Sequence, residues 1–207
     1  MVVTKEHIVA WLEDLAEVFQ QNQDFLTQLD REIGDADHGL NMNRGFRKVI
    51  ERLPTVADKD IGTILKTTGM TLLSSIGGAS GPLYGTFFIR AASSVMAKEE
   101  LTLKDVTVML SDACEGVQKR GKAVIGDKTM IDAMVPMVES LEQSQSTSLQ
   151  QALEHALQAA EKGMKDTIPL VAKKGRASYL GERSAGHQDP GATSTYLIVN
   201  SLVKAAF

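Results

Sequence analysis

The sequence predicts an all-α protein with about eight helices that run up and down in turn. Apolar residues recur every three or four positions through long segments, which is typical of amphipathic helices. Runs of β-branched residues that alternate with polar ones are nearly absent, so strands are not expected to build the core. With 207 residues, of which 43% are hydrophobic, the chain can bury one sizeable core. We therefore predict a single domain over residues 1–207.

The first four predicted helices begin at a capping residue or a proline and end at a turn signal or a proline. Their expected spans are Thr4 to about Asp30, Asn43 to about Leu53, Asp58 to Gly77-Gly78, and Gly81-Pro82 to about Val95. The first is long because Leu26 and Leu29 continue its apolar face beyond a polar turn. Pro54 ends the second, since proline breaks a helix interior.

The last four predicted helices show the same signals. Their expected spans are Thr102 to Gly121, about Lys128 to Leu141, Ser148 to Met164, and Asp189-Pro190 to Leu202. Thr102 and Asp105 resemble a capping box, and Gly121 is expected to stop its helix. Pro136 should kink the sixth helix or loosen one turn. Met130, Met134 and Met137 share one helical face, which predicts core packing, and Met130 is also placed to contact a flat ligand.

The connections between these helices differ in composition. Glycines and polar residues concentrate in the loops 30–41, 77–81, 121–128 and 173–191, whereas the loops 54–58, 97–102 and 142–148 are plainer. In an up-and-down bundle alternate connections share an end. The four rich loops follow the first, third, fifth and seventh helices, so we expect them to gather at one end of the molecule.

The composition excludes several classes of protein. The net charge is −4 and no cluster of lysine and arginine stands apart from acidic residues, so a nucleic-acid partner is not expected. Cys114 is the one cysteine, so no intramolecular disulfide forms, and it should pack as a small apolar residue. No signal peptide or membrane-spanning run is recognisable, which predicts a cytoplasmic protein without a membrane partner.

The first rich loop holds three aspartates, Asp30, Asp35 and Asp37, within eight positions. Like charges so close raise one another's pKa unless a cation offsets them. Carboxylate oxygens suit hard ions such as Mg²⁺, and the spacing does not meet the calcium-loop pattern. The three aspartates are therefore predicted to bind a divalent cation. The alternative is a solvated acidic turn in which one carboxylate caps the next helix.

The neighbouring polar residues allow more than one role. His38 suits a metal ligand, a hydrogen bond to phosphate, a group that orients another residue, or a plain loop histidine. Asn41 lies at a helix start, where its amide or the backbone N–H groups suit an anion. The small residues Gly78, Ala79 and Ser80 allow the close backbone approach that a phosphate needs, although a helix stop and start would explain much of that stretch.

Two further segments have features of ligand sites. Residues 116–122, G-V-Q-K-R-G-K, match the first part of a P-loop, but Ala123 stands where serine or threonine is required and the preceding segment is helical. The P-loop hypothesis is therefore rejected. In the long loop 173–191, Arg176 suits a phosphate, a ribose or base, or the plain surface. Asp189 is first of all an N-cap.

Several stretches, in order along the chain, resemble the nucleotide-binding L subunits of bacterial dihydroxyacetone kinases. They are Asp30, 34–39 (G-D-A-D-H-G), 77–82 (G-G-A-S-G-P), 126–130 (G-D-K-T-M), 175–179 (G-R-A-S-Y) and 187–191 (H-Q-D-P-G). The likeness covers essentially the whole chain. It implies a closed barrel of eight antiparallel helices with a nucleotide at one end.

The resemblance also implies which residues bind. The metal ligands for two Mg²⁺ ions would be Asp30, Asp35 and Asp37. The phosphate contacts would be His38, Gly39, Leu40, Asn41, Ala79 and Ser80. The rest of the nucleotide would be enclosed by Gly121, Met130, Arg176, Asp189, Pro190 and Gly191.

The function that the resemblance implies is phosphoryl transfer between subunits. The sequence G-D-A-D-H-G at 34–39, rather than the G-D-G-D-T-G of related fatty-acid-kinase domains, favours the dihydroxyacetone branch. In the phosphoenolpyruvate-dependent system, ADP stays tightly bound as a cofactor and a phosphohistidine-bearing M subunit converts it to ATP. The phosphoryl group then passes to dihydroxyacetone on the K subunit. The alternatives are an ADP-dependent regulatory or interaction module and the L subunit of an ATP-dependent kinase.

Overall fold

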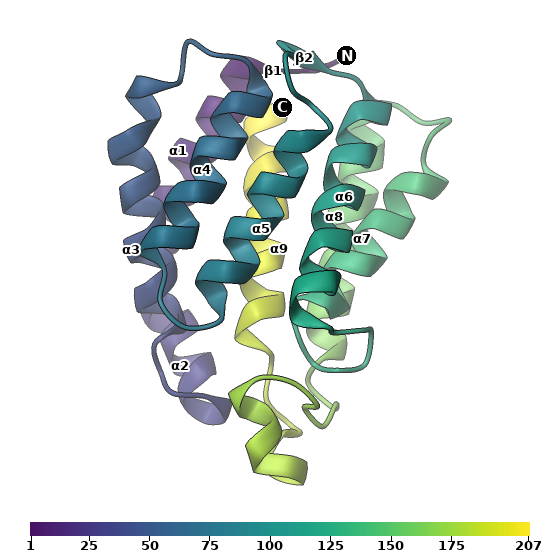
Figure 1. Cartoon of the computed structure of the whole chain (residues 1–207). Helices are drawn as coiled ribbons and strands as arrows, with labels where there is room; N and C mark the ends of the chain where they lie inside the picture. The colour runs from purple at the N-terminus through teal and green to yellow at the C-terminus, as the bar shows by residue number, and fades with distance from the viewer.

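The computed structural model describes residues 1–207 and consists almost entirely of helices (Figure 1). The α-helices are α1 (Lys5–Gln21), α2 (Gln23–Ile33), α3 (His38–Arg52), α4 (Ile61–Ser75), α5 (Ser80–Ser93), α6 (Leu103–Gly121), α7 (Ile131–Gln143), α8 (Leu149–Asp166) and α9 (Pro190–Ala206). Two 3₁₀ helices, η1 (Leu53–Thr55) and η2 (Arg176–Ser184), and two short strands, β1 (Val3–Thr4) and β2 (Glu100–Leu101), complete the fold. The prediction of an all-α protein is confirmed.

Eight of the helices form a closed ring. In the order α1, α3, α4, α5, α6, α7, α8 and α9 each helix packs on the next, and α9 packs on α1. The helix α2 lies at one end, against α3, α9 and η2. The predicted number of eight helices equals the number in the ring. The prediction treats α1 and α2 as one helix, and α2 lies outside the ring.

Asn22 is the reason that α1 and α2 are separate helices. Its backbone N–H and its side-chain amide both donate to the carbonyl of Val18, the latter at 2.8 Å, and this closes α1. The chain then turns while Phe19 and Leu26, on either side of the break, both stay buried. The predicted continuous helix from Thr4 to Asp30 is wrong for this reason.

Other helix boundaries also differ from the prediction. The helix α3 begins at His38 and not at Asn43, and α7 begins at Ile131 and not near Lys128. Lys128 has φ 61°, which is left-handed and ends any helix that passes through it. Gly121 ends α6 as predicted, but the left-handed residue of the cap is Lys122. The helix α7 continues through Pro136.

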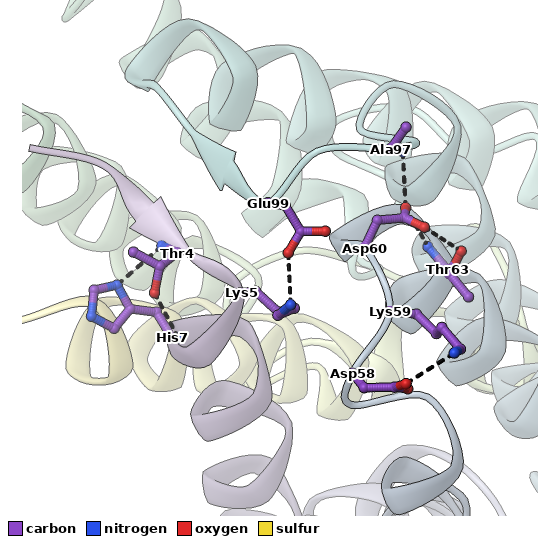
Figure 2. A network of polar contacts seen from close by, with 9 residues as sticks. All are labelled: Thr4, Lys5, His7, Asp58, Lys59, Asp60, Thr63, Ala97 and Glu99. Carbon is purple, nitrogen blue, oxygen red and sulfur yellow. Dashed lines mark hydrogen bonds and ion pairs between the residues drawn. The ribbon is translucent and has the colours of Figure 1, made fainter.

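The N-cap of α4 is Asp60, two residues after the predicted Asp58. Its carboxylate accepts hydrogen bonds from the N–H of Thr63 at 3.0 Å and from the N–H of Ala97 at 2.9 Å (Figure 2). Asp58 points away from this cap and pairs with Lys59 at 2.9 Å. Asp60 serves as the N-cap in place of Asp58 because its carboxylate also binds Ala97, and so joins the start of α4 to the turn after α5.

The hydrophobic core fills the inside of the ring with 45 connected buried residues. Phe19 stacks on Phe46, and the indole N–H of Trp11 donates to the carbonyl of Ile198 at 3.0 Å, so α1, α3 and α9 are joined there. Met134 and Met137 are completely buried and Cys114 is nearly so, which confirms their predicted packing. None of the helices is long and apolar enough to span a membrane.

The two ends of the ring carry different structures. One end holds both chain termini and the antiparallel pair β1–β2 (Figure 1), with the polar network of Figure 2 beside it. The other end holds α2, η2 and the rich loops. The expectation that these loops gather at one end is confirmed by the pocket that they line.

Candidate functional site

A pocket of about 530 Å³ opens at the end of the ring that carries the rich loops. Its walls come from the α2–α3 turn, the start of α5, the end of α6 with the loop that follows, residues 174–177 at the start of η2, and the residues just before and at the start of α9. The predicted site residues on its surface are Asp30, Asp35, Asp37, His38, Ala79, Ser80, Gly121, Met130, Arg176, Asp189, Pro190 and Gly191.

Asp30, Asp35 and Asp37 form a carboxylate cluster in which one oxygen from each lies within 4.8 Å of the others. The positive group paired with this cluster is Arg176, whose Nε lies 2.9 Å from Asp35. Three carboxylates and one guanidinium leave excess negative charge at the cluster. Oxygen donors with excess charge are the set that Mg²⁺ prefers, so the residues fit a divalent cation.

Local backbone geometry brings the three carboxylates together. Asp30, in the last turn of α2, accepts hydrogen bonds from the N–H groups of Asp37 at 2.8 Å and of His38 at 3.2 Å. These bonds close the start of α3, which explains why α3 begins earlier than predicted. A Cβ on Gly34 would lie 2.0 Å from the carboxylate of Asp30, so a side chain at this position would displace that carboxylate. Ala36 takes the left-handed conformation, with φ 61°, within this turn.

His38 is buried beside the cluster and both of its ring nitrogens are engaged. Nδ1 hydrogen-bonds with Ser80 Oγ at 3.2 Å, and Nε2 hydrogen-bonds with Ser194 Oγ at 2.9 Å. Ser194 in turn contacts the hydroxyl of Tyr84. Burial lowers the pKa of His38 to about 4, against the opposing charge of Asp37. His38 is therefore a neutral group that orients Ser80 at the start of α5.

The start of α5 offers backbone donors to the pocket. Ala79 is the N-cap, and no side chain caps this helix. The first N–H groups of such a helix are free to bind an anion, which the helix dipole also favours. A Cβ on Gly81 would lie 2.2 Å from the carbonyl oxygen of Ile76, so the tight entry to α5 requires glycine. Ala79 and Ser80 thus sit where a phosphate group fits.

The start of α9 forms another part of the pocket wall. Asp189 caps the helix by accepting from the N–H of Ala192 at 2.6 Å, as predicted. Burial raises the pKa of Asp189 to about 7, and nearby Asp132 adds to the effect while Lys128 opposes it. A Cβ on Gly191 would lie 3.5 Å from Met130, so this turn and Met130 pack closely at the pocket surface.

Three predicted site residues lie outside the pocket lining: Gly39, Leu40 and Asn41. A Cβ on Gly39 would lie 1.9 Å from the carbonyl of Gln23, so its role is to let α2 and α3 cross closely. Leu40 is 51% exposed. Asn41 accepts a hydrogen bond from Arg44 at 2.6 Å. Their contact with a ligand stays a prediction.

The pocket also includes residues that were not predicted as ligand contacts: Leu83, Tyr84, Arg120, Lys128, Thr129 and Lys174. Arg120 and Lys174 belong to short basic stretches that the sequence displays, so a search for charges beside the rich loops would have found them. Tyr84 carried no local signal, because its hydroxyl partners are 107 and 110 residues away.

The sequence of residues 32–204 matches the family model of the DAK2 domain. The chain belongs to this family. It is 59% identical, over 100% of its own length and 99% of the relative's, to the Escherichia coli (strain K12) protein "PEP-dependent dihydroxyacetone kinase, ADP-binding subunit DhaL". The family predicted from the sequence is thereby confirmed.

Two solved structures of the dihydroxyacetone kinase of C. freundii share the fold. The native form superposes with a TM-score of 0.73 and the complex with AMP-PNP and Mg²⁺ with a TM-score of 0.68, each at 25% identity. Each match covers 95% of this chain but only about a third of the longer kinase, 34% and 33% respectively. This chain therefore has the fold of one part of that dihydroxyacetone kinase.

Proposed function

We propose that this chain is the nucleotide-binding subunit of a phosphoenolpyruvate-dependent dihydroxyacetone kinase. ADP is held in the end pocket, is phosphorylated there by a phosphohistidine-bearing M subunit, and passes the phosphoryl group to dihydroxyacetone on a K subunit. The observation that carries the proposal is that the carboxylate cluster and the uncapped start of α5 line the same pocket. The name and the full-length similarity of the E. coli relative support the same assignment.

Different residues bind different parts of the nucleotide and its metal ions. Asp30, Asp35 and Asp37 would hold two Mg²⁺ ions, which would neutralise charge on the phosphate oxygens. The free N–H groups at Ala79 and Ser80 bind phosphate oxygens at the start of α5. Phosphoryl transfer depends mainly on positioning and charge neutralisation, which is what this set of groups provides.

The chain needs no general base of its own in this proposal. His38 is neutral and buried, and both ring nitrogens are already hydrogen-bonded, so it is not free to take a proton from a substrate hydroxyl. We place the substrate-binding residues on the K subunit. The reaction takes place in the cytoplasm, in keeping with the compartment expected from the sequence.

Mass spectrometry of the denatured, purified protein tests the nucleotide assignment, since tightly held ADP should appear at about one per chain. A protein that lacks nucleotide and also fails to bind ADP with Mg²⁺ would overturn the proposal. Phosphate flow from phosphoenolpyruvate to dihydroxyacetone in the reconstituted system tests the transfer. If partner subunits associate in an ADP-dependent way but no phosphate is transferred, the chain is a regulatory module instead. If bound ADP exchanges rapidly for ATP, the chain is the L subunit of an ATP-dependent kinase.

A further inference from the structure

Lys128 is a buried lysine with no carboxylate partner. It lies in the loop between α6 and α7, only 1% of its surface is exposed, and its backbone is left-handed with φ 61°. Lysine is almost never so buried unless its charge is satisfied. None of the ion pairs of this structure includes Lys128. Asp132 and Asp189 are near enough to attract its charge, but the groups that accept its hydrogen bonds are neutral.

Those partners are four backbone carbonyl groups. The ammonium group donates to Thr167 at 2.8 Å, Ile168 at 3.4 Å, Leu170 at 3.1 Å and His187 at 2.5 Å. An ammonium group has three hydrogens, so all of its donors are used and one bond is shared. The first three carbonyls follow α8 and the fourth precedes α9, so one side chain holds both ends of the segment 167–187.

The segment 167–187 carries η2 and, with it, Arg176. It is the light green part of the chain below α8 and α9 in Figure 1. Arg176 extends from it to Asp35 of the carboxylate cluster, with 2.9 Å between Nε and the carboxylate. The segment is therefore the part of the pocket wall that reaches across to the proposed metal ligands.

We infer that Lys128 is a positioning residue that holds the segment 167–187, and through it Arg176, against the nucleotide pocket. This inference rests on the proposed nucleotide-binding function. Leu170 and His187 accept no other hydrogen bond through their carbonyls, so removal of the ammonium group leaves both unpaired. The segment should then open more often and Arg176 should spend less time at the pocket.

The test compares Lys128→Met, which keeps most of the unbranched apolar side chain but removes its donors, with Lys173→Met. Lys173 is an exposed lysine in the same group of loops, so the control makes the same change in charge. We expect Lys128→Met to weaken ADP-Mg binding by about tenfold, within the range of coupling between contacting residues, and Lys173→Met to change it less than about twofold. Amide hydrogen exchange should accelerate in 167–187 and not in α1 or α4.

A double-mutant cycle separates positioning from a general loss of stability. In an Arg176→Ala background, Lys128→Met should change ADP-Mg affinity less than about threefold, because the group through which it acts is already gone. Equal losses in both backgrounds would overturn the inference, and so would normal affinity and exchange in Lys128→Met. Failure of the wild-type chain to bind ADP-Mg would instead overturn the proposed function.

A measurement on the wild-type chain keeps the inference testable if Lys128→Met does not fold. In a ¹⁵N-lysine-labelled sample, one ammonium group should be protected from proton exchange, because the opening of 167–187 that exposes its amides also exposes this ammonium group. ADP-Mg should slow both together. An ammonium signal that exchanges independently of the segment, or a segment that ADP-Mg binding leaves unchanged, would contradict the role of Lys128.

Discussion

At the scale of the residue, the carboxylate of Asp35 is exposed on one side and faces Asp30 and Asp37 on the other. Asp35→Asn should weaken ADP-Mg binding by at least about tenfold, since even the outer partners of metal ligands usually cost that much. Isothermal calorimetry measures the affinity, and circular dichroism should show unchanged helical content.

Glu32→Gln is the matched control for Asp35→Asn. Glu32 lies in the same acidic stretch, but its carboxylate accepts a hydrogen bond from Gln28 at 2.6 Å and does not belong to the cluster. The two variants lose the same charge, so ADP-Mg affinity should fall only for Asp35→Asn. Equal losses would mean that net charge at this end, and not ligation, decides the affinity.

Gly34 tests how far the cluster depends on its backbone. A methyl group at Gly34 would collide with the Asp30 carboxylate, 2.0 Å away, and turn it out of the cluster. Gly34→Ala should therefore weaken ADP-Mg binding, again measured by calorimetry. In an Asp30→Asn background the same change should add little, because the carboxylate that it displaces is already neutralised. If Gly34→Ala weakens ADP-Mg binding by the same factor in both backgrounds, Gly34 does not act through the Asp30 carboxylate.

At the scale of the element, the start of α4 is held by Asp60 far from the pocket. Its carboxylate accepts from the N–H and the hydroxyl of Thr63 and from the N–H of Ala97 (Figure 2). Asp60→Ala should lower the free energy of unfolding by about 1–2 kcal/mol, as expected for a lost N-cap. Chemical denaturation measures this. Asp58→Ala should leave the free energy of unfolding nearly unchanged.

The contribution of Asp60 should also depend on pH. Burial acts to raise the pKa of Asp60, but the hydrogen bonds from Thr63 and Ala97 outweigh it and leave the pKa below its ordinary value of 3.8. The unfolded chain therefore takes up the proton first as the pH falls. The stability that Asp60 adds is present above pH 3.8 and is lost below it. The difference between wild type and Asp60→Ala should shrink accordingly in acid.

At the scale of the whole molecule, the ring separates the end that carries the chain termini and the strand pair from the end that carries the pocket. A ligand that binds only the folded state adds about 2.7 kcal/mol to the free energy of unfolding at one hundred times its dissociation constant. ADP with Mg²⁺ should therefore raise the midpoint of thermal unfolding, and excess chelator should reverse the rise. ADP that stabilises equally with chelator present would contradict metal-dependent binding.

The helices and much of the site could be predicted because their signals are local. Thr102 with Asp105, Ser148 with Gln151 and Asp189 with Ala192 form the expected caps over only three residues. Apolar periodicity identified the faces that pack in the core. The three aspartates and the four rich loops were visible as composition. From these signals the class of fold, and the end of the ring that holds the pocket, both follow.

Tertiary structure decided what depends on groups far apart in the chain. Asp60 is the cap instead of Asp58 because Ala97, 37 residues away, also donates to it. His38 orients Ser80 only because Ser194, 156 residues away, holds its other nitrogen. The sequence predicts Lys128 at the start of a helix. In the structure its ammonium group instead donates to four carbonyl groups that lie 39 to 59 residues further along the chain. The sequence by itself determined the helices and the residue types of the site. The tertiary structure decided which role each of these residues has. Hydrogen bonds act over only a few ångströms, and groups far apart in the sequence come that close only when the ring of helices closes.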